Sequence, residues 1–284
     1  MNTLSLSRRA AVVRGLVEGG SIRAVARMTG TNKDTVMRIV AEVGEFCAIY
    51  QSFTLTNLPC TRVEADEIWS FVGAKEKNKT KAGQGDLWTY TGMCADSKLI
   101  FSWLVGSRDH TTARVFMNDL ASRLKNRVQI TTDGHTMYLG AVENAFGWNG
   151  ADFAQLVKKY GTADGKPGRY GTPEMCIGAE KVVVFGNPDM EKVSTSYVER
   201  ANLSMRMGMR RFTRSTNAFS KKAANHAYSV DLHMMHYNYC RPHQTLTRAA
   251  KGIKTTPAMA AGLTDRVWSV EDLLSKMDPR TLLH

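Results

Sequence analysis

Apolar residues in positions 5–50 recur at helical spacing and predict three short helices. A Gly-Gly pair ends the first helix, and Ser21 is placed to cap the second. Gly30 ends the second helix, and Thr31 or Asn32 can cap a third that extends to about Phe46. Two short helices joined by a turn with glycine are the helix-turn-helix arrangement, whose second helix enters the major groove of DNA.

The exposed face of the third predicted helix carries polar side chains that can reach base edges or phosphates. A small three-helix bundle without a ligand is the alternative interpretation. Helix lengths, the turn glycine and the polar face together favour DNA binding. The candidate DNA-binding residues of this helix are Asn32, Lys33, Thr35 and Arg38.

From residue 63 onward the pattern changes from helical spacing to β-rich segments that alternate with amphipathic helices. Three strands, a helix, a strand, a helix and a further strand are the order of the ribonuclease-H-like fold. We therefore expect an α/β protein, with a mixed five-stranded sheet and flanking helices, preceded by an all-α helix-turn-helix domain. The strands are expected at 63–72, 87–95, 99–105, 128–132 and 153–157, and the helices between them at 111–124 and 138–146.

The rest of the chain divides less regularly. Glycines and prolines around a short apolar run predict a loop or insertion at 161–196. A long helix is expected from about Ser196 past Met209, and a second from Ser220 to Tyr239. The expected domains are 1–50 (helix-turn-helix), 51–62 (linker), 63–255 (catalytic) and 256–284 (a tail with a short helix).

Composition narrows the class of partner. The 38 Lys and Arg residues outnumber the 26 Asp and Glu, and a net charge of +12 favours a polyanion such as DNA. The five cysteines are odd in number and form no CxxC pair, so neither a disulfide framework nor a thiolate zinc site is expected. No apolar run approaches the roughly 20 residues that cross a bilayer. We expect a cytoplasmic, nucleoid-associated protein without a membrane partner.

Three carboxylates lie at the positions where a chain with the ribonuclease-H-like order of elements carries a two-metal site. Asp66 lies in the first strand, Asp133 follows a later strand, and Glu199 lies near the start of a basic helix. Phosphodiester transfer needs an activated oxygen nucleophile and charge neutralisation at phosphorus, and two Mg²⁺ (or Mn²⁺) ions held by clustered carboxylates supply both. These three residues are the candidate catalytic and metal-binding residues.

Each carboxylate also has a plainer interpretation. Strand alternation sends Asp66 and Glu67 to opposite faces, and the pattern alone does not decide which face holds metals. Asp133 precedes glycine and can be a turn residue, while Glu199 can simply favour the helix dipole. Isolated histidines such as His135 are not expected to bind metal, because Mg²⁺ prefers oxygen.

The helix that contains Glu199 continues into a strongly basic segment. Such an excess of one sign is expected along a phosphate backbone rather than on a solvated face. The basic loop at 75–81 is a second candidate patch, with a solvated hairpin as its alternative; the segment 237–243 can contact DNA or simply end a helix. The candidate DNA-binding residues in and after the helix are Arg200, Asn202, Arg206, Arg210, Arg211 and Arg214.

Four segments together resemble a bacterial insertion-sequence transposase of the DDE class, and most closely the insertion-sequence-one (IS-one) family. The resemblance covers about residues 60–250, and the third segment is its most specific part. The segments are ADEIWSFVG (65–73), TTDGHTMY (131–138), VERANLSMRMGMRRFTRSTNAFSK (198–221) and YNYCRPHQTL (237–246).

The resemblance implies that Asp66, Asp133 and Glu199 are the metal-binding triad and that Arg206 contacts the end of the element. It implies that water exposes a 3′-hydroxyl, which then attacks target DNA in line. The cysteine zinc finger of many relatives has no counterpart, so recognition of the terminal inverted repeats is expected to rest on residues 20–46. Joining two double-stranded ends to a target implies a homodimer or higher oligomer.

Two other functions remain compatible with the sequence. A helix-turn-helix transcriptional regulator would use the second domain to sense a ligand or dimerise. A nuclease without strand-transfer activity would cleave DNA but not join it. Loss of strand transfer without loss of end binding, in a variant of Asp133, distinguishes the transposase from both.

Overall fold

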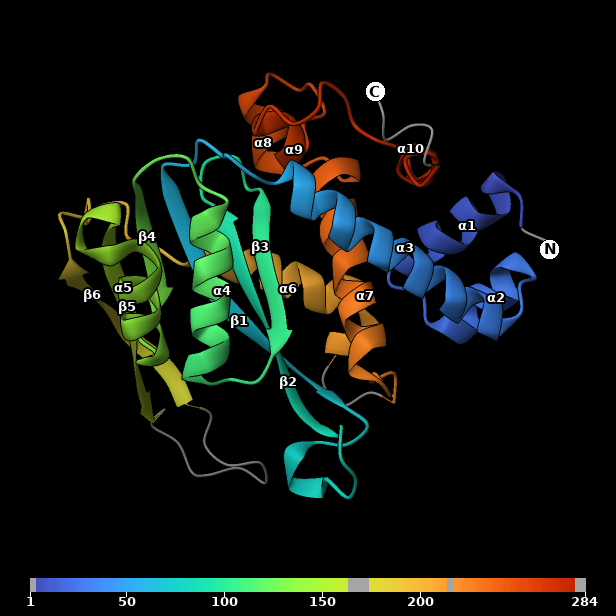
Figure 1. Cartoon of the computed structure of the whole chain (residues 1–284), viewed down its shortest axis with the longest axis horizontal. Helices are drawn as coiled ribbons and strands as arrows, with labels where there is room; N and C mark the ends of the chain where they lie inside the picture. The colour runs from blue at the N-terminus through green and yellow to red at the C-terminus, as the bar shows by residue number, and fades with distance from the viewer. Residues whose placement is uncertain (1–3, 163–173, 214–216, 279–284) are drawn as a thin grey trace.

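A computed structural model describes residues 4–162, 174–213 and 217–278, and shows an α/β protein with helices on both faces of a mixed sheet (Figure 1). Within these residues the sheet has six strands in the order β3-β2-β1-β4-β5-β6. This arrangement is compatible with the ribonuclease-H-like fold. The strands are β1 (Arg62–Val72), β2 (Gly85–Cys94), β3 (Ile100–Gly106), β4 (Val128–Asp133), β5 (Ala151–Thr162) and β6 (Glu174–Phe185).

The central strand β1 determines where the acidic residues lie. It pairs antiparallel with β2 and parallel with β4. In the parallel pair Ala65 is opposite Thr132, so the next residues along, Asp66 and Asp133, lie side by side. The predicted β1, β4 and hairpin turn before β3 are confirmed to within two residues at each end.

The expected five-stranded sheet and the loop at 161–196 are corrected by β6. This strand pairs antiparallel with β5, which itself runs to Thr162, well beyond its predicted end. Glycines and prolines hid the strand, and β6 lies at the edge of the sheet, where one row of backbone groups needs no partner strand. Ile177 and Val183 of β6 are exposed, so the strand has no regular alternation of buried apolar and exposed polar residues that the sequence could have revealed.

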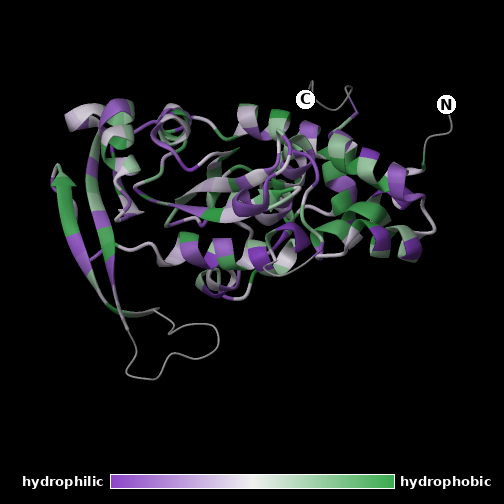
Figure 2. Ribbon diagram, turned by 90° about the horizontal axis from the view of Figure 1, so that it is seen from below, coloured by the Kyte–Doolittle hydropathy of each residue, from purple (hydrophilic) through white to green (hydrophobic). Residues whose placement is uncertain are grey.

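The helices divide the hydrophobic core into two compartments. α4 (His110–Ser122) and α5 (Met137–Gly150) cover one face, whereas α6 (Ser196–Gly208) crosses β1 and β2 on the other. Seen from below, helices lie on both sides of the sheet (Figure 2). Ala65 packs in the compartment under α4 and α5, and Ile68 packs in the one under α6. Alternation along β1 therefore settles which face each acidic side chain takes.

Three helices precede the sheet: α1 (Leu6–Val17), α2 (Ile22–Thr29) and α3 (Lys33–Thr54). Ser21 caps α2 as predicted, Gly30 takes the left-handed conformation, and Asn32 caps α3. The expected linker at 51–62 is corrected, because α3 continues through its first residues. The reason is tertiary: Gln51 is buried and donates to the Asp231 carbonyl at 3.3 Å.

The C-terminal part lies beside these helices. α7 (Ala223–Met235) runs along α3 (Figure 1), and a π-helical turn (His236–Cys240) follows it. Thr256 caps the predicted helix start, and α10 packs against α1. No helix in the described part of the chain is long and apolar enough to cross a membrane. The remaining elements are short: η1 (Glu76–Asn78), η2 (Arg210–Phe212), α8 (Gln244–Ala249), α9 (Pro257–Ala260) and α10 (Val270–Ser275).

The contact between α3 and α7 depends on a glycine, which gives a first prediction. A Cβ on Gly44 would lie 2.3 Å from the Tyr228 carbonyl oxygen, so the two backbones touch. We expect Gly44→Ala to lower the free energy of unfolding by about 1–3 kcal/mol, as overpacking does. Urea denaturation measures the change. Gly140→Ala on α5, where a Cβ meets nothing within 4 Å, is the matched control and should be neutral or stabilising. Equal losses in both variants would contradict the close contact.

Candidate carboxylate site

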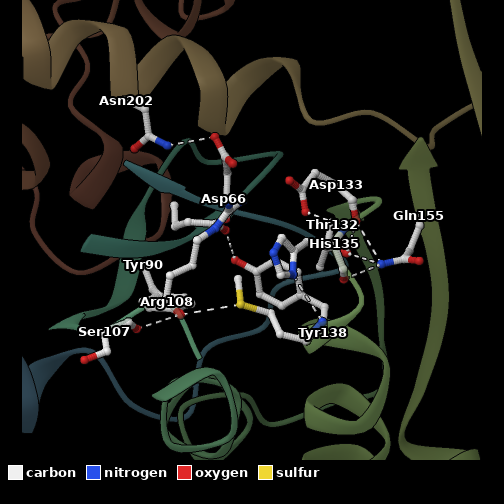
Figure 3. Close-up of polar contacts among 12 residues, drawn as sticks. Asp66, Tyr90, Ser107, Arg108, Thr132, Asp133, His135, Tyr138, Gln155 and Asn202 are labelled. Atoms are coloured by element: carbon white, nitrogen blue, oxygen red, sulfur yellow. Dashed lines mark hydrogen bonds and ion pairs between the residues drawn. The ribbon is translucent and has the colours of Figure 1, made fainter. Parts of the chain in front are cut away.

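Asp66 and Asp133 meet at the edge shared by β1 and β4. One carboxylate oxygen from each of Asp66, Glu67 and Asp133 lies within 4.8 Å of the others. Figure 3 shows the Asp66 and Asp133 side chains directed to the same side of the sheet, beneath α6. The structure thus brings together two of the three carboxylates that the sequence predicted, and adds Glu67 as a neighbour.

Glu67 is held differently from Asp66. Its side chain is buried, accepts from the Arg108 guanidinium at 2.6 Å, and accepts from the Tyr138 hydroxyl at 2.5 Å. Burial, followed by the charge of Glu67, raises the pKa of Tyr138 well above its usual value. The Arg108 cation therefore neutralises Glu67, and Asp66 is the carboxylate of β1 that remains available. Neither Arg108 nor Tyr138 was predicted as a site residue.

The carboxylates of this cluster change the pKa of Asp66. Burial, and then repulsion from Glu67 and Asp133, raise the pKa of Asp66 to about 7, while a hydrogen bond from Asn202 opposes the rise. The Asn202 amide nitrogen donates to Asp66 Oδ2 at 2.9 Å. Nearby carboxylates that disfavour one another's charge indicate a place where a cation would be stabilising.

The donor set fits a hard divalent cation. Carboxylate oxygens of Asp66 and Asp133 face the site, and the buried Asn202 Oδ1 has no hydrogen-bond partner among the described residues. Mg²⁺ and Mn²⁺ take carboxylate and amide oxygens as ligands. His135 Nδ1 accepts the Met137 N–H at 3.3 Å. Sequence reasoning placed Asn202 among DNA contacts; the structure places it on Asp66.

Glu199 lies outside the group of oxygens within 4.8 Å. Its Oε1 accepts from Lys158 Nζ at 2.6 Å and from the Thr195 hydroxyl. Although burial lowers the pKa of Lys158, the hydrogen bond from Glu199 and the charges of Glu199 and Asp66 raise it overall. Lys158 is thus a cation that is paired with Glu199 and interacts electrostatically with Asp66. Its position on β5, a strand expected to end at 157, hid it from the sequence analysis.

Glu64 places α6 over the site. Its buried carboxylate accepts the backbone N–H groups of Tyr197 at 2.8 Å and of Val198 at 3.0 Å. These belong to the first turn of α6, whose N-cap residue Thr195 makes no capping bond to the helix backbone. Burial raises the pKa of Glu64 to about 7, and the two N–H groups oppose the rise. A carboxylate of β1 therefore replaces the missing cap and fixes where Asn202 lies.

The chain after β4 is fixed by β5. Gln155 Nε2 donates to the carbonyl oxygens of Asp133 at 2.9 Å and of His135 at 3.2 Å. Asp133 Oδ1 accepts the His135 N–H at 3.1 Å. Figure 3 shows Gln155 reaching across to this turn. Asp133 is therefore both a residue that stabilises the turn after β4 and a member of the carboxylate cluster.

The candidate DNA-binding residues of α3 lie at its beginning. Asn32 uses its Oδ1 to accept the Asp34 N–H at 2.8 Å, and is itself exposed. Lys33 and Arg38 are exposed, and Thr35 is half-buried. The polar face predicted for this helix is therefore accessible.

The basic residues around α6 fall into different surroundings. Arg200 is exposed, Arg206 is half-buried, and Arg210 is exposed but lies after the helix, which ends at Gly208 rather than past residue 209. The expectation of a helix that continues past Met209 is corrected accordingly. Met209 has extended backbone angles and begins a 3-10 turn.

Arg211 is directed into the protein. It donates to Ser220 Oγ at 2.9 Å, beside the buried His226, and burial lowers the pKa of Arg211. This position supports a structural role for Arg211, and a DNA contact there stays a prediction. Arg214 lies outside the described residues.

Comparison with known proteins adds no relative. No protein-family model matches the chain, and no curated protein matches it. The geometry of Asp66, Asp133 and their neighbours is therefore what a functional proposal has to rest on.

The cap from Glu64 gives a second prediction. Glu64→Leu should lower the free energy of unfolding by about 2–4 kcal/mol, because two buried N–H groups lose their acceptor. Glu64→Gln keeps an oxygen in place and should lose much less. Urea denaturation of both variants distinguishes the cases. If the two substitutions cost the same, the oxygen of residue 64 does not hold α6.

Proposed function

We propose that this protein is a transposase that binds the terminal inverted repeats of a mobile element and catalyses Mg²⁺-dependent DNA cleavage and strand transfer. The observation that carries the proposal is the meeting of Asp66 and Asp133, from neighbouring parallel strands, with oxygens within 4.8 Å. The net charge of +12 fits a DNA partner.

The ribonuclease-H-like assignment of the sheet is part of this proposal. It is supported by the strand order, by the parallel β1–β4 pair, and by α6 crossing β1 with a carboxylate on its first turn. The helix-turn-helix assignment is supported by α2, the left-handed Gly30, and the exposed polar start of α3. In this proposal α3 reads the element end, and the sheet carries the chemistry.

The metal-binding residues in this proposal are Asp66, Asp133 and Glu199, and the Asn202 amide nitrogen positions Asp66 through its hydrogen bond. Two Mg²⁺ or Mn²⁺ ions, when bound, supply an activated oxygen nucleophile and neutralise charge at the scissile phosphate. Glu199 joins the other carboxylates by exchanging Lys158 for a cation. Arg200, Arg206 and Arg210 bind phosphates along the strand, and Arg108 offsets the charge of Glu67 beside the site.

Two copies or more are expected in the working complex, because two element ends have to be joined to one target. The proposal places the protein with DNA in the bacterial nucleoid. A helix-turn-helix regulator does not need two acidic residues crowded at one sheet edge, and so accounts less well for the raised pKa of Asp66. A nuclease without strand transfer needs the same site, and only its products separate it from the transposase.

A third prediction tests the proposed function directly. Asp133→Asn keeps an oxygen that accepts the His135 N–H, but removes the charge that the reaction requires. Strand transfer should fall by at least about a thousandfold, while binding of the ends should stay within about threefold. The assay uses labelled DNA from either side of the coding sequence as ends, a supercoiled plasmid as target, and a mobility-shift measurement of binding.

Asp265→Asn is the matched control, because Asp265 is exposed and far along the chain from the site. It should retain full strand transfer. Cleavage without joining by the unsubstituted protein would favour the nuclease. DNA binding without any cleavage, and no effect of Asp133→Asn, would favour the regulator.

A fourth prediction concerns Lys158. Lys158→Gln removes a cation that competes for Glu199, so Mn²⁺ should bind about two- to fivefold more tightly, the range for a partly exposed ion pair. Titration calorimetry or Mn²⁺ paramagnetic resonance measures the affinity. Lys159→Gln breaks the exposed pair with Glu180 instead and should leave the affinity unchanged. Weaker binding by Lys158→Gln would show that Lys158 supports the metal site and does not compete with it.

A further inference from the structure

Two cysteine side chains meet at the end of the sheet where β1 begins. Cys60 lies between α3 and β1, and Cys94 is the last residue of β2. Strand pairing sets Val63 opposite Cys94, and the Ala95 N–H donates to the Arg62 carbonyl at 2.9 Å. The Cys60 thiol donates to the Arg62 carbonyl oxygen at 3.1 Å, and both cysteines line one cavity. Chain segments far apart in sequence thus bring the two cysteines together at one end of the sheet.

The surroundings make the two sulfurs unequal. Cys94 ends β2, next to the turn that contains Asp96 and Ser97. The neighbouring Cys60 thiol and, against burial, the polar groups of Ser97 and Asp96 lower the pKa of Cys94 to about 6. The neighbouring Cys94 and burial raise the pKa of Cys60. Cys94 is therefore placed to be the nucleophile and Cys60 its protonated partner.

A pocket gives small molecules a route to the pair. Both cysteines line a cavity of about 280 Å³, together with Pro59, Asp96 and Ala260. Its walls come from the segment before β1, the β2–β3 turn and the end of α9. Such a volume exceeds the roughly 30 Å³ of one water molecule several times over, so a small peroxide fits. Bulky thiol reagents do not enter a space of this size as readily.

We propose that Cys60 and Cys94 form a hydroperoxide-sensitive dithiol that closes reversibly into an intramolecular disulfide. The Cys94 thiolate attacks one peroxide oxygen, the O–O bond breaks, and water or an alcohol leaves with a proton. The resulting sulfenic acid is attacked by the Cys60 sulfur, which forms the S–S bond and releases water. The two thiols lose two electrons in all, and the peroxide is reduced by them.

The disulfide would act on the connection between the helices and the sheet. Cys60 lies in the short segment that leaves α3 and enters β1, and its carbonyl oxygen accepts from Asn126 Nδ2 at 2.7 Å. Bonding it to Cys94 ties this segment to the β2 end of the sheet. Cys94 pairs with Val63, three residues before Asp66 on β1, and the proposal does not depend on the proposed transposase activity.

Peptide mapping of the folded protein tests the proposal. A few equivalents of hydrogen peroxide should produce one intramolecular link that joins the Cys60 and Cys94 peptides, lowers the mass by two hydrogen atoms, and is reversed by dithiothreitol. The exposed Cys176 is replaced by serine in all samples to prevent links between molecules. Cys60 and Cys94 peptides that stay alkylatable after peroxide treatment would overturn the proposal, as would oxidation of Cys94 to a sulfinic acid without any link.

Two variants assign the roles. Cys94→Ser should slow thiol loss by about tenfold or more, because the thiolate is gone. Cys60→Ser should leave a persistent sulfenic acid on Cys94, which dimedone traps. Cys47→Ser, at another buried cysteine, is the control and should change neither result. A Cys60→Ser protein that reacts with peroxide no differently from the control would contradict the assignment.

Discussion

The site depends on one buried interaction, the acceptance of two α6 backbone N–H groups by the Glu64 carboxylate. The helix lacks a side-chain cap of its own, so the strand beneath supplies the negative charge that a helix N-terminus stabilises. Because this bond fixes the first turn of α6, it also fixes Asn202 about one turn later, where the amide meets Asp66. Strand and helix thus hold each other in the one geometry in which carboxylate and amide face the same space.

Three acidic residues in four positions of one strand make β1 electrostatically costly. Each is offset by a different partner: helix N–H groups for Glu64, Asn202 for Asp66, and Arg108 for Glu67. The offset is incomplete, since the pKa values of Glu64 and Asp66 are both raised to about 7. Buried carboxylates whose charge is incompletely offset lower the stability of a protein, and such residues are typical of functional sites.

Much of this arrangement could be predicted from local patterns. The strand period around Asp66, the helix cap at Ser21 and the strand that ends at Asp133 depend on neighbours in sequence, and the structure agrees with them. What could not be predicted depends on partners far away. β6 is a strand because β5 pairs with it, α3 is long because Gln51 is buried against α7, and Glu199 is turned toward a lysine from β5. Likewise the helical spacing after Glu199 indicated a continuous basic face, which the break after Gly208 interrupts.

The length of α3 has a geometric consequence. At 22 residues it spans roughly 33 Å, from a solvent-facing start to an end that is packed against α7. The absence of side chain at Gly44 lets the two helix backbones touch, which leaves little room for bending between them. In a complex with DNA, α3 would then act as a molecular ruler. If the proposed function holds, base pairs contacted at its beginning would lie about one turn of the double helix from its far end.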